Sequence, residues 1–120
     1  MSNDCSRKIK TCFIGFGKRT KLFYAPILKK LKDDFELCGF TKKTQNNVND
    51  ITKDYEIDFY ESTESLLEKA RPDLIILSVP SGEVLKILNK LKNSNCVIFA
   101  DTPFYWGMED LNNLNILVLI

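Results

Sequence analysis

The sequence predicts an α/β fold, in which a doubly wound parallel sheet is covered by helices on both faces in three layers, α/β/α. Three observations predict this class. Apolar runs typical of strands alternate with helical patterns along the 120 residues, as in strand–helix–strand units. The connections between these segments are short, so right-handed crossovers between parallel strands are expected. The run from Leu74 to Leu77 has no polar alternation, as expected for a central strand that is buried on both faces.

Six segments are predicted as strands, because they are short runs rich in apolar, β-branched or aromatic residues. In chain order they cover residues 9–14, 35–40, 57–60, 73–79, 96–100 and 116–120. A doubly wound sheet built from six such strands has the order 3-2-1-4-5-6.

Five helices are predicted between the strands, at residues 20–32, 41–54, 62–70, 81–93 and 108–114. In the first helix, apolar residues recur at intervals of three and four, so one face is apolar. These residues are Leu22, Phe23, Ile27, Leu28 and Leu31. The second segment is polar and rich in Asn and Lys, and it is expected to form a loose helix at most. Capping residues open the third helix, and Pro72 ends it.

The composition excludes several classes of protein. The formal net charge is +1, so neither nucleic acid nor an anionic membrane is an expected partner. No apolar run is long enough for a transmembrane helix, and the polar N-terminus lacks the apolar segment of a signal peptide. The chain contains no histidine, which excludes Ser-His-Asp and Cys-His catalysis and HExxH zinc sites.

The cysteines form no CxxC pair, and most of them lie in predicted strands. They are Cys5, Cys12, Cys38 and Cys96. We expect buried thiols that behave as small hydrophobic groups, rather than disulfides or metal ligands. No metal site is therefore predicted. Without an export signal, the expected compartment is the cytoplasm, where disulfides are rare.

The loop after the first predicted strand carries a GxG pattern directly between a strand and a helix. Its residues are Gly15, Phe16, Gly17, Lys18, Arg19 and Thr20. In a dinucleotide-binding fold, the first glycine allows a tight turn, and the second lets the backbone approach a pyrophosphate at the helix N-terminus. Thr20 stands at the third glycine position, where its larger side chain is expected to push helix and strand apart or to swing the helix outward. The alternative is a structural turn that binds no ligand.

The end of the second predicted strand bears on the choice of cofactor. A fold that prefers NAD places Asp or Glu here to accept hydrogen bonds from the ribose hydroxyls. This sequence instead has Thr41, Lys42 and Lys43, and Lys18 and Arg19 lie on the adjoining loop. Together these side chains could surround a 2′-phosphate, so NADP is favoured over NAD. The alternative is a lysine-rich face that only contacts solvent.

The residues that follow the GxG pattern form a second, longer motif. Gly15 and Gly17 are followed in register by Phe23, Ala25 and Pro26. This opening resembles that of the Gfo/Idh/MocA oxidoreductases, in which the first strand runs into GxGxxG and then Phe-His-Ala-Pro; here Tyr24 replaces the usual histidine. The resemblance covers essentially the whole chain, but only the cofactor-binding half of the family. It implies a Rossmann fold.

The same resemblance implies two further loops at the site. Ser78, Val79 and Pro80 are similar to the family's loop beside the nicotinamide and its ribose. Asp101, Thr102 and Pro103 stand where the family carries Glu-Lys-Pro, whose lysine is thought to bind the substrate hydroxyl and to assist proton transfer. Asp101 and Thr102 are therefore also expected beside the cofactor.

Thr102 cannot take over the role of that lysine, because it is neutral and does not titrate near neutral pH. Asp101 and Tyr105 are the remaining catalytic candidates. We expect the Asp101 carboxylate to be open to water, which would make it a poor proton donor at neutral pH. The alternative is that Asp101 only caps the turn before Pro103.

These features predict that residues 1–120 form a single dinucleotide-binding domain, the N-terminal part of a longer, two-domain polypeptide. The resemblance implies that the domain holds a nicotinamide cofactor, so that a hydride passes to or from a small substrate of sugar, polyol or imine type held by a second domain. The chain alone is expected to be inactive, and a homo-oligomer is compatible with this interpretation. The alternative is a catalytically silent nucleotide-binding or protein-interaction domain that keeps the same fold.

Overall fold

A parallel sheet of six strands forms the centre of the molecule. The computed structural model describes residues 7–101 and 115–118, and the strands in this part of the chain pair in the order β3-β2-β1-β4-β5-β6. Every neighbouring pair is parallel. The strands are β1 (Ile9–Ile14), β2 (Phe35–Thr41), β3 (Asp58–Tyr60), β4 (Leu74–Leu77), β5 (Val97–Ala100) and β6 (Asn115–Val118). The predicted fold class and strand order are both confirmed.

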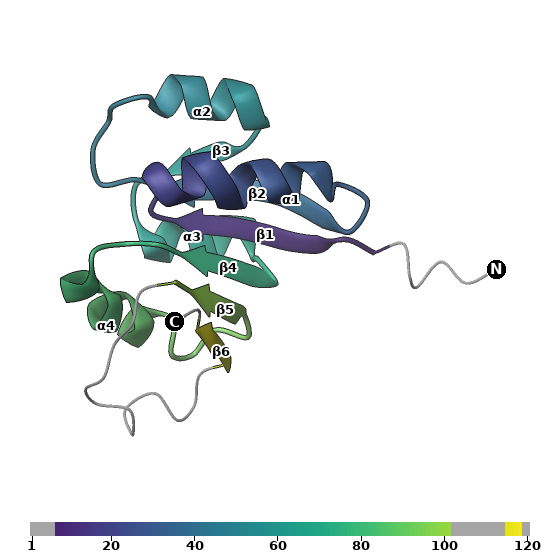
Figure 1. The fold of residues 1–120 in the computed structure, drawn as a ribbon. Coiled ribbons are helices and arrows are strands. Elements are labelled where there is room, and N and C mark those ends of the chain that lie inside the picture. The colour runs from purple at the N-terminus through teal and green to yellow at the C-terminus, as the bar shows by residue number, and fades with distance from the viewer. Residues whose placement is uncertain (1–6, 102–114, 119–120) are drawn as a thin grey trace.

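Helices cover both faces of the sheet, with α1 and α2 on one face and α3 and α4 on the other (Figure 1). The helical segments are the π-helical turn η2 (Thr20–Tyr24), α1 (Ala25–Lys30), α2 (Val48–Tyr55), α3 (Thr63–Ala70) and α4 (Ser81–Lys90). The predicted helix at residues 108–114 and the last two residues of the predicted final strand lie outside the described residues. No helix in the described ranges is long and apolar enough to cross a membrane.

Neighbouring residues of β1 point to opposite faces of the sheet, so each face has its own core. Phe13 packs with Phe40 on the face covered by α1 and α2, and Ile14 packs with Ile75 on the face covered by α4. Cys12 is fully buried beside α3, and burial raises the pKa of its thiol to about 12. The thiol therefore stays neutral and packs as a small hydrophobic group, as the sequence predicted.

The first helix contains a wide turn that its sequence pattern did not predict. In η2 the N–H of Ala25 donates to the carbonyl of Thr20, five residues earlier, and α1 continues from there. Pro26 accounts for this geometry. In a regular helix its ring would collide with the carbonyl of the preceding turn, and it has no N–H to donate.

The apolar face of this helix points away from the core, although an apolar face ordinarily packs inward. The exposed residues are Leu22, Phe23, Ile27 and Leu31, each more than 40% exposed. The side that packs on the sheet carries Tyr24, Ala25 and Leu28, of which Ala25 is fully buried. The helix has two adjacent apolar stripes, and the spacing of the apolar residues does not predict which of the two packs against the sheet. The small side chain of Ala25 lets the inner stripe approach the sheet closely.

The polar segment predicted as a loose helix at residues 41–54 divides into two parts. Thr41 is the last residue of β2, and a regular helix, α2, begins only at Val48. Asn47 adopts a left-handed conformation (φ +63°) that turns the chain into this helix. Ile51 is buried under α2 and anchors it to the core. Val48 and Tyr55 are partly buried against the same cluster, so three residues at the two ends and the middle of α2 hold this otherwise polar helix on the core.

The strand order creates a crevice at the carboxyl ends of β1 and β4. The connection that leaves β1 runs to one face of the sheet, and the connection that leaves β4 runs to the other (Figure 1). The two loops therefore diverge at this point, which is where ligands bind in open α/β sheets.

Candidate functional site

Gly15, the first residue after β1, sets the geometry of the crevice. Its φ is +87°, a conformation that favours glycine, and a Cβ at this position would collide with the carbonyl oxygen of Ser78. The N–H of Gly15 donates to the carbonyl of Thr41 over 3.2 Å. The absence of a side chain at Gly15 therefore allows the ends of β1, β2 and β4 to meet closely.

Gly17 differs from Gly15, because it borders open space. A Cβ built on Gly17 would meet no other heavy atom within 4 Å. Helical structure begins at the next residue, and the Gly17 carbonyl accepts the N–H of Lys21 over 2.9 Å. Bare backbone at the start of a helix can be approached closely by an anion, which the free N–H groups there would bind. The surroundings of Gly17 therefore fit the predicted pyrophosphate-binding role.

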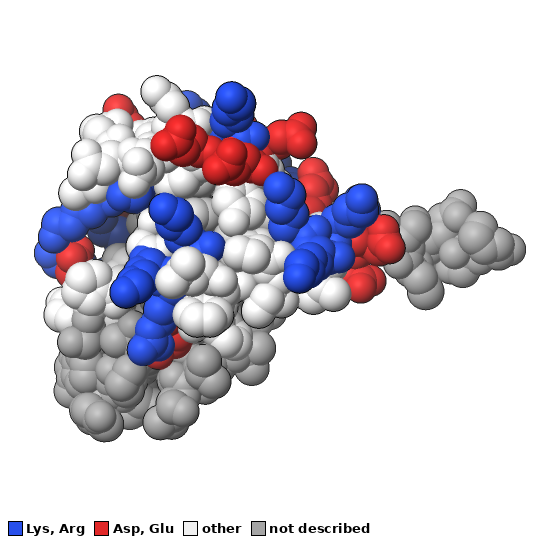
Figure 2. Space-filling view, turned by 45° about the horizontal axis from the view of Figure 1, so that its top comes forward, with Lys and Arg blue, Asp and Glu red and all other residues white. Residues whose placement is uncertain are grey.

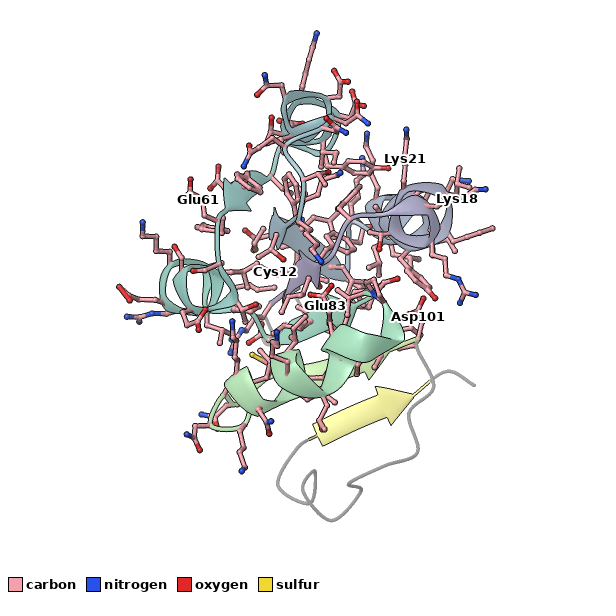
Figure 3. All side chains as sticks on the ribbon, turned by 90° about the vertical axis from the view of Figure 1, so that its left-hand side faces the viewer. Cys12, Lys18, Lys21, Glu61, Glu83 and Asp101 are labelled. Carbon is pink, nitrogen blue, oxygen red and sulfur yellow. The ribbon has the colours of Figure 1, made fainter. Side chains whose placement is uncertain are left out.

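A cavity of about 440 Å³ opens beside these glycines, and we refer to it as the switch-point cavity. Nine of the predicted site residues line it: Gly15, Phe16, Gly17, Thr41, Lys42, Lys43, Ser78, Val79 and Pro80. Figure 3 looks onto this edge of the sheet, where the parallel strands end. The structure therefore brings together the loops after β1, β2 and β4, which lie far apart in the sequence.

Several further residues line the cavity, and none of them was predicted from the sequence. These residues are Thr44, Glu61, Ser62, Thr63, Glu83, Lys86, Ile87 and Lys90. The Nζ of Lys43 lies 3.0 Å from Oε2 of Glu83, so an ion pair joins the loop after β2 to α4. The position of Glu61, directly after β3, was a usable signal, because parallel strands end at the same edge of a sheet. No such rule points to the α4 residues.

Asp101, directly after β5, is buried and accepts several side-chain hydrogen bonds. Its Oδ2 accepts the Tyr24 hydroxyl over 2.9 Å, the Ser78 hydroxyl over 3.1 Å and an Arg19 N–H over 3.5 Å. Asp101 is only 4% exposed, so the expectation that its carboxylate is open to water is wrong. These three partners come from different segments: Tyr24 from η2, Ser78 from the loop after β4, and Arg19 from the residues before η2. Together with the packed core they leave the carboxylate almost no contact with solvent. Thr102 and Tyr105 lie outside the described residues.

Tyr24 takes the position of the family's histidine and points its phenol at this carboxylate. Burial and then the hydrogen bond to Asp101 raise the pKa of Tyr24 above its ordinary value. The phenol is therefore protonated at neutral pH and donates to Asp101. Its ring lies edge-on to Phe99, with 5.8 Å between the ring centres, which holds the hydroxyl in place.

Lys18, Arg19 and Thr20 do not line the switch-point cavity, whereas Phe16 lines it and also packs in the core. Thr20 is fully buried, and its hydroxyl donates to the Gly15 carbonyl over 3.5 Å, so its side chain lies between the helix and the glycine loop. The ring of Phe16 packs edge-on against Phe13 and Phe40, so its side chain belongs to the core. Within residues 7–101 and 115–118, no cluster of three acidic or cysteine side chains is suited to a metal ion.

The fold and the loop geometry agree with a known family. Residues 9–118 match the family model GFO_IDH_MocA, an oxidoreductase family with an NAD-binding Rossmann fold. The chain belongs to the Gfo/Idh/MocA oxidoreductases. The predicted membership is confirmed, and residues 9–118 form the NAD-binding domain of this family.

Solved structures of two dehydrogenases and a ketoreductase share this architecture. A dehydrogenase (MviM) from Clostridium difficile is 27% identical, with a TM-score of 0.79 over 93% of this chain. KijD10, a 3-ketoreductase from Actinomadura kijaniata solved with NADP and TDP-benzene, is 15% identical, with a TM-score of 0.71 over 81%. The WlbA dehydrogenase from Bordetella pertussis, solved with NADH and UDP-GlcNAcA, is 19% identical, with a TM-score of 0.74 over 87%.

This Gfo/Idh/MocA domain is much shorter than those proteins. The chain spans 39% of the Clostridium difficile dehydrogenase, 30% of KijD10 and 31% of WlbA. No curated protein matches the sequence significantly.

Proposed function

We propose that the switch-point cavity holds a nicotinamide dinucleotide, with NADP favoured over NAD, and that the chain is the cofactor-binding part of an oxidoreductase. The observation that carries this proposal is Gly17. Its bare backbone borders a cavity of about 440 Å³ at the start of a helix and at the reversal point of the strand order. These are the surroundings that a pyrophosphate requires.

The residues of the cavity fit the successive parts of such a cofactor. The backbone around Gly15 and Gly17 would hold the pyrophosphate, and the loop of residues 78–80 would line the nicotinamide end. Thr41 would hydrogen-bond the adenosine ribose. When bound, the nicotinamide supplies hydride-transfer chemistry at the edge of the sheet.

The preference for NADP rests on the chain's own charges. β2 ends at Thr41 and is followed by Lys42 and Lys43, so it lacks the carboxylate that accepts hydrogen bonds from both ribose hydroxyls in NAD-preferring folds. The fold itself accommodates either cofactor, since KijD10 was solved with NADP and WlbA with NADH. Cationic side chains after β2 favour the cofactor that carries an additional phosphate.

We infer that the substrate is small and related to a sugar. WlbA was solved with UDP-GlcNAcA, which carries a sugar, and KijD10, a 3-ketoreductase, was solved with TDP-benzene. In this proposal a second domain would present the substrate carbon to the carboxyl ends of β4 and β5.

A catalytically silent binding domain is the second candidate. The observation that favours it is the state of Asp101, whose carboxylate is buried and accepts hydrogen bonds from Tyr24 and Ser78. This carboxylate is engaged with partners inside the domain, and Thr102 stands where the family carries its lysine.

A cofactor titration tests the leading proposal. The 120-residue chain is titrated with NADPH and with NADH, and binding is followed by the fluorescence of the reduced nicotinamide and by calorimetry. We expect saturable binding of both, with NADPH bound more tightly. If a chain that is folded by circular dichroism binds neither cofactor, the proposal is wrong.

A further inference from the structure

Asp101 does not line the switch-point cavity, but one of the side chains bonded to it does. Its Oδ2 accepts hydrogen bonds from Tyr24, Ser78 and Arg19. Of these three donors, Ser78 is the one that lines the cavity. In Figure 3, Asp101 lies between the first helix and α4, behind the edge where the strands end. Asp101 can therefore act on a molecule in the cavity through Ser78.

The three donors do not hold the carboxylate equally. The Arg19 bond is the longest, at 3.5 Å, and the Arg19 side chain is 65% exposed, whereas that of Asp101 is 2% exposed. Arg19 reaches inward from a face on which Figure 2 shows several Lys and Arg side chains. An ion pair with one solvated partner contributes little to stability. The hydroxyls of Tyr24 and Ser78, at 2.9 and 3.1 Å, are therefore the partners that fix Asp101.

Ser78 is held through its backbone as well as through its side chain. Its N–H donates to the Ile14 carbonyl over 3.1 Å, at the end of β1. Its hydroxyl donates to Asp101, whose own N–H donates to the Leu77 carbonyl over 3.3 Å. Ser78 therefore joins the ends of β1, β4 and β5, and Asp101 sets the direction of its hydroxyl.

That direction decides which groups of a ligand Ser78 can bind. A serine hydroxyl has one proton and two lone pairs, and a carboxylate only accepts. Because the Ser78 proton is directed at Asp101, the Ser78 oxygen can only accept a hydrogen bond from a molecule in the cavity. A pyrophosphate has no proton to donate at neutral pH. The nicotinamide half of a dinucleotide has two kinds of donor, the carboxamide N–H groups and the ribose hydroxyls.

Tyr24 holds the carboxylate in the position that this arrangement needs. Its hydroxyl makes the shortest of the three bonds to Asp101, and its ring is fixed edge-on against Phe99. Tyr24 ends the turn η2, which follows the glycine loop by a few residues. The network therefore ties the start of the first helix to the loop after β4.

We propose that Tyr24 and Asp101 are positioning residues, which direct the Ser78 hydroxyl so that its oxygen accepts a hydrogen bond from the nicotinamide half of the cofactor. This inference rests on the proposed function, because it needs the dinucleotide in the switch-point cavity. Ser78 would touch the cofactor, and Tyr24 and Asp101 would act through Ser78.

A double-mutant cycle on cofactor binding tests this order of contacts. The variants are Ser78→Ala, Tyr24→Phe and the double variant. Tyr60→Phe is the matched control, because Tyr60 is a half-buried tyrosine on β3 that does not line the cavity. Each folded variant is titrated with NADPH and with adenosine 2′,5′-bisphosphate, which has no nicotinamide half, and binding is measured by calorimetry.

The expected losses are confined to the ligand that has a nicotinamide. Ser78→Ala should weaken NADPH binding about fivefold and Tyr24→Phe about threefold, since a neutral hydrogen bond contributes on that scale. The double variant should bind NADPH no more weakly than Ser78→Ala, because Tyr24 acts through Ser78. Binding of the bisphosphate should stay unchanged in every variant, and Tyr60→Phe should leave both ligands unchanged.

An NADPH analogue with an acetyl group in place of the carboxamide distinguishes the two possible donors. If Ser78→Ala weakens NADPH but not the analogue, the carboxamide is the donor. If it weakens both equally, a ribose hydroxyl is the donor. Either result supports the proposal.

Three results would overturn the positioning role and leave the cofactor proposal intact. They are an unchanged NADPH affinity in Ser78→Ala, losses that add in the double variant, and an equal loss of the bisphosphate, which would mean that the network only supports the fold. The same loss in Tyr60→Phe would also overturn it. Failure of the unmodified, folded chain to bind NADPH and NADH would overturn both proposals.

Discussion

The two glycines of the loop after β1 have different physical roles, although they belong to one motif. Gly17 can accept a side chain without a clash, because a Cβ there would meet nothing within 4 Å. We predict that Gly17→Val abolishes cofactor binding, because the new side chain fills the place of the pyrophosphate. The free energy of unfolding should stay within about 1–2 kcal/mol of the parent. Calorimetric titration and urea unfolding of the same variant measure the two effects.

Gly15→Ala provides the contrast. The left-handed φ of +87° and the nearby Ser78 carbonyl leave no room for a methyl group, so this variant should lose stability and binding together. A Gly17→Val protein that still binds NADPH normally would show that the loop is only a structural turn.

The individual site residues differ in how well the sequence predicted them. The glycines and Ser78 were predictable, because they follow apolar strands and parallel strands end at one edge. The surroundings of Asp101 were not. Its partners Tyr24 and Ser78 lie 77 and 23 positions away in the chain. Only the folded packing of η2 and of the β4 loop shows that this carboxylate is enclosed.

At the level of elements, the strands were the most predictable part of the molecule. β1 and β4 are central strands, and their apolar runs have no competing interpretation once helical patterns flank them. The first helix was harder, because it has two adjacent apolar stripes. Pro26 was visible in the sequence, but the wide turn that accommodates it was not predicted. The choice of the inner stripe depends on how closely Ala25 approaches the sheet.

The exposed stripe of α1 leads to a prediction about stability. Ile27 is 54% exposed, whereas Leu88 of α4 is fully buried in the opposite core. We expect Ile27→Ala to change the free energy of unfolding by about 0.5 kcal/mol or less. Leu88→Ala should cost about 2–5 kcal/mol, because it leaves a cavity in a packed core. Urea unfolding of both variants measures the difference. Similar losses in the two variants would mean that the α1 stripe is covered in solution.

At the scale of the whole molecule, the residues that we propose to bind the cofactor lie at one edge of one sheet. The switch-point cavity lies there, and the hydrogen bond from Ser78 to Asp101 joins the neighbouring ends of β4 and β5. Relatives such as the Clostridium difficile dehydrogenase are more than twice as long, since this chain spans 39% of that protein. Cofactor binding and catalysis can therefore be tested separately.

The last prediction is that the 120-residue chain binds NADPH but does not oxidise it. Hydride transfer needs an acceptor carbon held close to the nicotinamide, and a proton donor within hydrogen-bond reach of the substrate. Oδ2 of Asp101 already accepts hydrogen bonds from Tyr24, Ser78 and Arg19, so this carboxylate is engaged within the protein rather than directed at a substrate. The Tyr24 phenol has a proton, but the raised pKa of Tyr24 and its bond to Asp101 hold that proton in place.

The measurement is the rate of NADPH oxidation with a panel of aldehydes, ketones and imines. NADPH is present at a concentration that saturates the chain. We expect no rate above that of NADPH alone. Turnover that survives Tyr24→Phe but disappears in Asp101→Asn would make Asp101 the acid, in spite of its burial. Turnover that disappears in Tyr24→Phe would instead identify the phenol as the donor, with Asp101 as the residue that positions it. In either case the domain would be a complete enzyme, and the proposal that a second domain supplies the substrate site would be wrong.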